Sequence, residues 1–214
     1  MAGNVGFFAA KCGVEAGTRC GENAQLLRRP AFRGGLVRTG GTRGRIVGPG
    51  KELRVFAMSD DVELCRAVMA ASVNAEAREA VARVYAELQA EVDRRRPACV
   101  VSGRCCRFEE YGHRLYVTTL EVGAFVHGLT AAPPAGWDGT GCPFQVRKMC
   151  GVHGIRPFGC RMFFCDATAE QWQNEQYERF HAQLKRLHET LAVPYFYVEW
   201  RRALRALGLS GGRA

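Results

Sequence analysis

The hydrophobic positions in the middle of the chain follow a helical period. Apolar residues recur three and four positions apart at Val81, Val84, Tyr85, Leu88 and Val92. Residues with this spacing share one face of an α-helix. Ser59 or Asp60 supplies an N-terminal cap, and Pro97 stops the pattern. We therefore expect a helix from Ser59 to the residue before Pro97, with Cys65 on its buried side.

A change of pattern follows this helix. Residues 114–118 (RLYVT) alternate like a short strand, and Thr118 and Glu121 have the spacing of a capping box, which predicts a short helix through about Phe125. An Ala/Pro/Gly loop then runs from Thr130 to Gly141. The central chain therefore reads as short elements separated by irregular segments.

Two helices are predicted near the C-terminus. Thr168 and Gln171 repeat the capping-box spacing and predict a helix to about Leu191. A last helix is expected after Pro194. Its apolar residues are Phe196, Val198, Trp200, Leu204 and Leu207. Together the elements indicate a mainly α fold with short β elements, in which helices frame an irregular, cysteine-rich segment.

Charge separates the N-terminal segment from the rest of the chain. Residues 1–57 hold ten Lys or Arg against three acidic residues, whereas the remaining chain is nearly balanced. The segment is rich in Gly and Arg and has no sustained hydrophobic period, which favours a disordered basic leader or an N-terminal extension, with Met58 as an alternative start. A nucleic-acid-binding arm is the weaker interpretation. We treat Cys12 and Cys20 as incidental and predict a single domain over residues 58–210.

Seven cysteines lie between Cys99 and Cys165, among Gly, Pro and Arg residues instead of in apolar helical stripes. They are Cys99, Cys105, Cys106, Cys142, Cys150, Cys160 and Cys165. Sulfur concentrated in this way favours metal ligation or disulfides over core packing. Residues 99–165 form the core of the predicted domain.

The compartment decides between metal and disulfide, because structural disulfides are rare in the cytosol. The first six residues carry no basic side chain of the kind that opens a secretory signal. No stretch approaches the roughly 18 apolar residues of a membrane helix. We predict a cytoplasmic protein with no membrane association whose thiols are reduced and bind metal, with a secreted disulfide scaffold as the weaker alternative.

Basic residues stand beside the clustered cysteines. Arg156 and Arg161 bracket the turn from Pro157 to Cys160, and we predict that they help to bind the anionic cofactor. Cations near thiols favour the thiolate form, which is the form that ligates metals. The absence of any Cys-x-x-Cys pair makes zinc-finger and rubredoxin-like ribbons poor matches.

The order of these motifs resembles the CxxCxxCC (YkgJ-type) cysteine-cluster family, which is described as a zinc- or iron-chelating domain. The segment CVVSGRCC corresponds to the four-cysteine element, Thr118 to Glu121 to the strand and helix start, CPF to a second element, and the stretch with RPFGCR to a third. The resemblance covers residues 99–165. It implies bound iron, as ions or in an iron-sulfur cluster, or zinc.

Two positions depart from the family pattern. Ser102 stands where the family has its second cysteine, so either one ligand is missing or Cys165 replaces it. His153 stands where the family has an aromatic residue, and it is either a metal ligand or a surface group.

The first functional hypothesis is a metal-binding protein with all seven cysteines as candidate ligands. The alternative is an iron-sulfur enzyme such as a protein lysine N-methylase, which is suggested only by proteins with a similar cysteine element. A radical-SAM-type CxxxCxxC, a GxGxxG loop, a P-loop and an HExxH motif are all absent. The sequence names no substrate and no protein partner, and a nucleic-acid partner is not expected.

Overall fold

The computed structural model describes residues 58–210, and the predicted leader lies outside the described residues. The fold is mainly helical with short β elements, as the sequence predicts. Five α-helices longer than one turn carry it. They are α2 (Met58–Val73), α3 (Ala75–Arg95), α4 (Thr119–Gly128), α6 (Glu170–Thr190) and α7 (Trp200–Ala206). A one-turn helix, α5 (Phe158–Met162), lies inside the cysteine-rich part of the chain.

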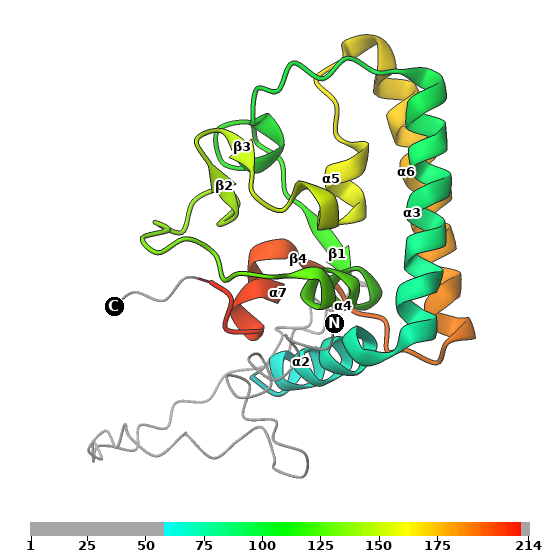
Figure 1. Ribbon diagram of the computed structural model, residues 1–214, viewed down its shortest axis with the longest axis vertical. Helices are drawn as coiled ribbons and strands as arrows, with labels where there is room; N and C mark the ends of the chain where they lie inside the picture. Colours follow the sequence, from blue (N-terminus) through cyan, green and yellow to red (C-terminus); the bar gives the residue numbers. More distant parts are fainter. Residues whose placement is uncertain (1–57, 211–214) are drawn as a thin grey trace, which may run out of the picture.

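The first predicted helix is divided into two. Asn74 has an extended backbone and its side chain accepts a hydrogen bond from the Ala77 N–H, so it caps α3 and separates it from α2. An asparagine in this position competes with helical hydrogen bonding and starts a new helix. The expectation of one helix up to Pro97 was therefore wrong at this residue. The two helices meet at an angle in Figure 1.

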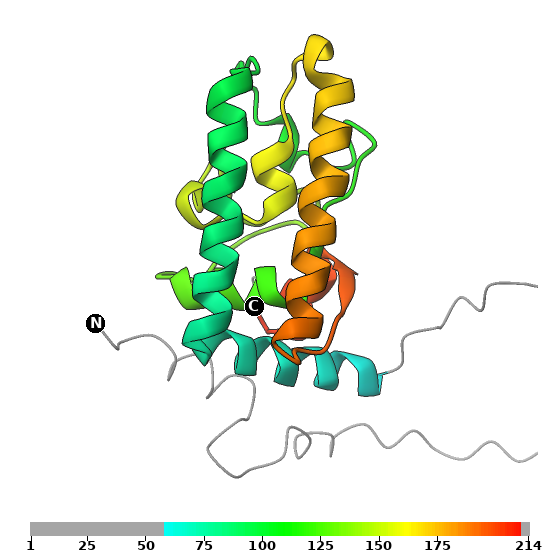
Figure 2. The ribbon, with the colours of Figure 1, turned by 90° about the vertical axis from the view of Figure 1, so that its right-hand side faces the viewer.

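Helices α3 and α6 run antiparallel, side by side, and α5 lies against them (Figures 1 and 2). Phe180 and Leu184 of α6, both fully buried, pack with Val81 and Leu88 of α3 and with Phe158 of α5. We call this cluster the Phe180 core. The periodic apolar face that the sequence shows in α3 is the face buried here.

A second cluster, the Trp200 core, joins α2, α4 and α7. Trp200 is 1% exposed, and its ring meets the Phe125 ring edge to face with centroids 4.8 Å apart. Helices α2 and α4 cross closely because Gly123 has no side chain, since a Cβ there would stand 2.8 Å from the Cβ of Ala71. Cys65 is 4% exposed within this core, as predicted.

Two small antiparallel sheets complete the fold. Strand β1 (Tyr116–Thr118) pairs with β4 (Tyr197–Glu199), with Val117 opposite Val198. Strand β2 (Gln145–Val146) pairs with β3 (Met149–Cys150). The first sheet ties the middle of the chain to its C-terminal part.

The β2–β3 hairpin turns through only two residues, Arg147 and Lys148. Both have positive φ, 50° and 66°, as a two-residue hairpin turn requires. Asparagine and glycine tolerate this conformation better than long side chains. The turn is therefore built from two exposed cations instead of the residues that its backbone favours.

Two C-terminal predictions need correction. Asp166, not Thr168, accepts the capping hydrogen bond, and a 3₁₀ turn (Ala167–Ala169) precedes α6. The last helix begins only at Trp200, because the residues just before it form β4 and pair with β1. β-branched and aromatic residues in a short run favour a strand when a partner strand is present.

Candidate functional site

The cysteine segments are brought together by their own backbone. The Cys142 N–H donates to the Cys106 carbonyl at 2.8 Å, and the Gln145 side-chain amide donates to the Gly103 carbonyl at 3.0 Å. Gly103 has φ 70°, and a Cβ there would lie 2.6 Å from the Lys148 carbonyl oxygen. Only glycine allows this approach of the first segment to the hairpin.

Cys106 lies at the centre of the converging thiols. It belongs to a 3₁₀ turn (Arg104–Cys106) and is 4% exposed. Its thiol forms hydrogen bonds with the side chains of Cys105, Cys142 and Cys150, and these bonds raise the pKa of Cys106. The adjacent pair of cysteines therefore points into one cluster, although neighbouring side chains diverge along an extended chain.

The pKa values of the three thiols that contact Cys106 are shifted in the opposite direction, downward. Hydrogen bonding with Cys106 lowers the pKa of Cys105 to about 7 and that of Cys150 to about 6. A separate hydrogen bond with Cys106 lowers the pKa of Cys142. Cys106 thus holds a proton that stabilises negative charge on the sulfur atoms around it.

Cys160, from α5, is the fifth thiol of the group. Burial raises its pKa, and negative charge on Cys142, Cys105 and Cys150 raises it further. These interactions place Cys160 near those three thiols, and it lines one cavity together with Cys106. We call Cys105, Cys106, Cys142, Cys150 and Cys160 the inner cluster.

Cys99 and Cys165 lie outside the inner cluster. Cys99 is exposed, and Cys165 is half-buried with its Sγ 3.5 Å from the Ser102 Oγ. Both thiols line a cavity of about 330 Å³ together with four thiols of the inner cluster, Cys105, Cys106, Cys150 and Cys160. Cys165 therefore lies beside Ser102, the position at which the cysteine-cluster family has its second cysteine. The ligand role of both outer thiols stays a prediction.

The two arginines of the predicted site differ in position. Arg156 lines the cavity, and its positive charge lowers the pKa of Cys105 and Cys150. Arg161 instead donates to the carbonyls of Arg156 and Gly154, at 2.9 and 2.8 Å, and lies over the Tyr85 ring. Of these two arginines, Arg156 lines the sulfur cavity, whereas Arg161 holds the turn that carries Arg156 and interacts electrostatically with Cys160.

His153 lines the same cavity but remains exposed. Its ring Nε2 contacts the Arg156 guanidinium, and burial, followed by the charges of Arg156 and Arg161, lowers the pKa of His153. The neutral imidazole is therefore the favoured form beside these cations.

The chemistry of the inner cluster fits iron or zinc, because both metals accept several thiolate ligands. Among the described residues, no group of three or more His, Cys, Asp or Glu side chains is already arranged to hold a metal ion. Metal binding would thus draw the sulfur atoms closer together and displace the proton that Cys106 holds.

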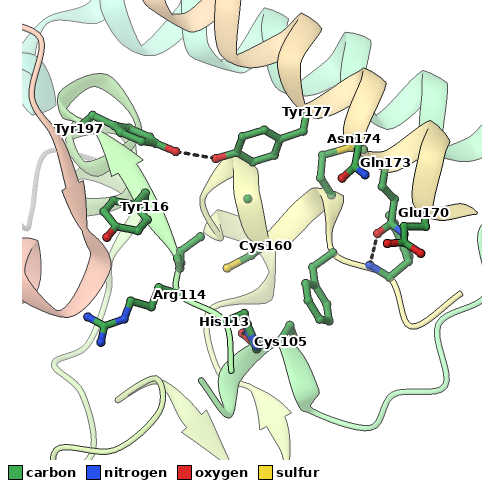
Figure 3. A pocket seen from close by; sticks show the side chains of 15 residues that line it. Cys105, His113, Arg114, Tyr116, Cys160, Glu170, Gln173, Asn174, Tyr177 and Tyr197 are labelled. Atoms are coloured by element: carbon green, nitrogen blue, oxygen red, sulfur yellow. Dashed lines mark hydrogen bonds between the residues drawn. The ribbon is translucent and has the colours of Figure 1, made fainter. Parts of the chain in front are cut away.

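A second cavity, of about 470 Å³, borders the inner cluster and was not foreseen from the sequence. We call it the cleft. Figure 3 shows Cys160 between a tyrosine side (Tyr116, Tyr177 and Tyr197) and the polar residues of α6. The residues come from distant parts of the chain, so only the helical spacing of the α6 members was visible in advance.

Glu121 was predicted only as a helix cap. The capping box with Thr118 is present, and the carboxylate also accepts the Phe158 N–H at 3.0 Å, which joins α4 to the turn before Cys160. Glu121 is 2% exposed, and burial raises the pKa of its carboxyl to about 7. The capping signal was readable in the sequence, whereas the link to α5 depends on tertiary packing.

Within residues 58–210, no helix is both long and apolar enough to cross a membrane. Comparison of the chain with protein-family models, with curated proteins and with solved structures gives no match. The resemblance to the YkgJ-type family therefore stays a prediction that depends on the cysteine motifs.

Proposed function

We propose that the protein binds a metal through its inner cluster, with iron, as ions or in an iron-sulfur cluster, favoured over zinc. The observation that carries the proposal is the position of Cys106, whose buried thiol interacts with three other thiols at once. Several thiolates cannot gather in a buried site unless a cation offsets their charge. The proton on Cys106 neutralises one thiolate of the inner cluster, and a metal ion would offset the negative charge of several.

The number of thiols at the cavity favours iron over zinc. A structural zinc ion takes four ligands, so a single zinc ion would leave some of these thiols unused. Here six cysteines line about 330 Å³, which suits a polynuclear centre such as an iron-sulfur cluster. Bound iron would supply one-electron chemistry, whereas bound zinc would act as a fixed cross-link.

The protein's own residues have separate roles in this proposal. The inner cluster supplies the thiolates, and Arg156 offsets their charge. Cys99 and Cys165 complete the cavity wall. Because reduced thiols are needed, we place the protein in the cytoplasm.

The test is the iron, zinc and acid-labile sulfide content of the full chain purified without oxygen, together with its colour. Iron with sulfide in a brown protein supports the first choice of metal, and zinc alone supports the second. No bound metal, with the seven clustered cysteines all reactive as free thiols, after reconstitution with iron and sulfide or with zinc, would contradict the proposal.

Cys106→Ser provides the matched test of the cluster, since it removes the shared thiol. We expect the variant to lose its metal. Cys65→Ser changes the same residue type in the Trp200 core and should retain the metal if it folds. Equal metal content in the two variants would refute the assignment of Cys106.

A further inference from the structure

The cleft has the dimensions of a small-molecule site. Its volume of about 470 Å³ falls in the range of ligand pockets, about 300–1,000 Å³. It lies between the residues that lead into β1, helix α5 and the N-terminal half of α6 (Figure 3). No role in metal binding requires this space.

The cleft and the sulfur cavity share a wall. Cys105 and Cys160 line both spaces, together with Phe163 and Phe164. A molecule in the cleft would therefore touch two thiols of the inner cluster.

One side of the cleft is a row of hydrogen-bonding groups on α6. Glu170, Gln173 and Asn174 follow at helical spacing and line the same space. The Gln173 side-chain oxygen accepts the Phe164 N–H at 2.7 Å, so its amide NH₂ is the group left to donate. Glu170 and Asn174 form no side-chain hydrogen bond with another described residue. The row thus offers acceptors and donors next to one another.

The opposite side is aromatic. The rings of Tyr116 and Tyr197 stack with centroids 5.3 Å apart, and the Tyr197 hydroxyl hydrogen-bonds the Tyr177 hydroxyl at 2.9 Å. Tyr116 is 40% exposed although it is a large ring. Fixed and partly exposed rings of this kind form a surface on which a flat ligand can stack.

A single cation stands at the edge of the lining. Arg114 is exposed and forms no ion pair with a described residue. Figure 3 shows its guanidinium directed away from Cys160, beside Tyr116. A planar guanidinium in this place suits a phosphate or carboxylate at the solvent end of a ligand.

We propose that the cleft binds a planar nitrogen heterocycle that carries an anionic group, the chemistry of a mononucleotide. The ring stacks on the tyrosine side, its edge pairs with Asn174 and Glu170, and the anionic group meets Arg114. Bound in this way, the ligand contacts Cys105 and Cys160. The groups that recognise the ligand, on the tyrosine side, on α6 and at Arg114, are not candidate metal ligands, so the proposal does not depend on the identity of the metal.

The test is calorimetric titration of the full chain with AMP, GMP, CMP and UMP, and with the matching nucleosides and inorganic phosphate. We expect at least one nucleotide to bind more tightly than its nucleoside, and phosphate alone to bind weakly. Arg114→Ala should weaken the nucleotide about tenfold, the effect of one charged hydrogen bond, and leave the nucleoside unchanged. Asn174→Ala should weaken both.

Controls are available on the same helix. Glu175→Ala and Arg186→Ala remove exposed side chains that do not line the cleft and should bind like the unchanged protein. Metal content, measured for every variant, separates this proposal from the previous one, since the cleft variants should keep it. The proposal is overturned if no nucleotide binds at millimolar concentration, or if Asn174→Ala and Arg114→Ala bind as the controls do.

Discussion

The helical frame and the cysteine segments are held together by different means. In the frame, long helices meet through fully buried side chains such as Phe180 and Trp200. In the cysteine segments the elements have five residues or fewer, and several of the side chains that meet are thiols. The frame therefore gains its stability from burial of apolar surface, which needs no ligand.

The difference indicates a division of work. Short loops and turns bury little apolar area of their own, and clustered thiols repel one another once they ionise. The frame supplies rigid ends for these segments, at Pro97 after α3 and at the start of α6. We therefore expect metal loss to loosen the cysteine segments and to leave the frame folded, and mutations in the frame to do the reverse.

The largest contrast is expected from substituting cysteines in the two regions. Cys142→Ser removes a thiol of the inner cluster, and we expect complete loss of bound metal with retained helical circular dichroism. Cys65→Ala should lower stability by about 1 kcal/mol, through loss of buried apolar surface, and keep the metal. Metal analysis of the two purified variants checks the pair. Full metal content in Cys142→Ser would remove this cysteine from the ligand set.

The second largest effect is the loss of stability expected when Phe180, in the Phe180 core, is truncated. Phe180 has 0% exposure, so Phe180→Ala should destabilise the protein by about 3–5 kcal/mol through lost transfer energy and an unfilled cavity. Urea unfolding followed by circular dichroism measures this. Tyr195→Ala, at a ring 39% exposed, is the control and should cost far less. If the two variants were equally stable, the Phe180 core would not be the main support of the frame.

Glu121 links the two regions and predicts a pH dependence. Burial raises its pKa from 4.5 to about 7, so the folded state binds a proton more tightly than the unfolded state. The Glu121 carboxyl contributes about 3 kcal/mol to the free energy of unfolding below about pH 4.5. This contribution is lost as the pH rises to about 7. The titratable groups that sense Glu121 are Tyr85, Tyr177, Tyr195 and Tyr197.

Glu121→Gln should abolish that part of the pH dependence. The measurement is the free energy of unfolding between pH 4.5 and 7.5 for the unchanged protein and the variant, and the difference between the two curves isolates this carboxyl. Parallel curves would show that the Glu121 carboxyl titrates alike in the folded and unfolded states.

The smallest effect concerns the cap between α2 and α3. Asn74→Ala removes the hydrogen bond to the Ala77 N–H and should cost about 1 kcal/mol, while Asn74→Gly should cost only a few tenths. Thermal unfolding of both variants provides the comparison. A larger loss of stability for the glycine variant would indicate that backbone freedom at residue 74, not the side-chain cap, determines where α2 ends and α3 begins.

The sequence predicted the parts of the fold that depend on local signals. The apolar face of α3 and the capping box of Thr118 and Glu121 are local, and both are present. Asn74 was also readable as a cap, but the continuing apolar pattern concealed it. Strand β4 could not be predicted because its conformation depends on pairing with β1, about 80 residues away.

The candidate site divides in the same way. Cysteine spacing identified the residues of the inner cluster, and the structure brings five of them together. Spacing could not show that Cys165 approaches Ser102, or that Arg156 lines the sulfur cavity while Arg161 does not. Those facts depend on the path of the chain through α5, which no sequence pattern records.

The two-residue turn of the β2–β3 hairpin has a consequence for proteolysis. Arg147 and Lys148 are the residue types after which trypsin cuts, and both are exposed. Cleavage requires the chain to open locally, and a hairpin this tight resists opening. Cys142 precedes the hairpin and Cys150 ends its second strand, so a metal that joins them would hold it shut. The rate of tryptic cleavage at this turn should therefore report how much of the protein carries its metal.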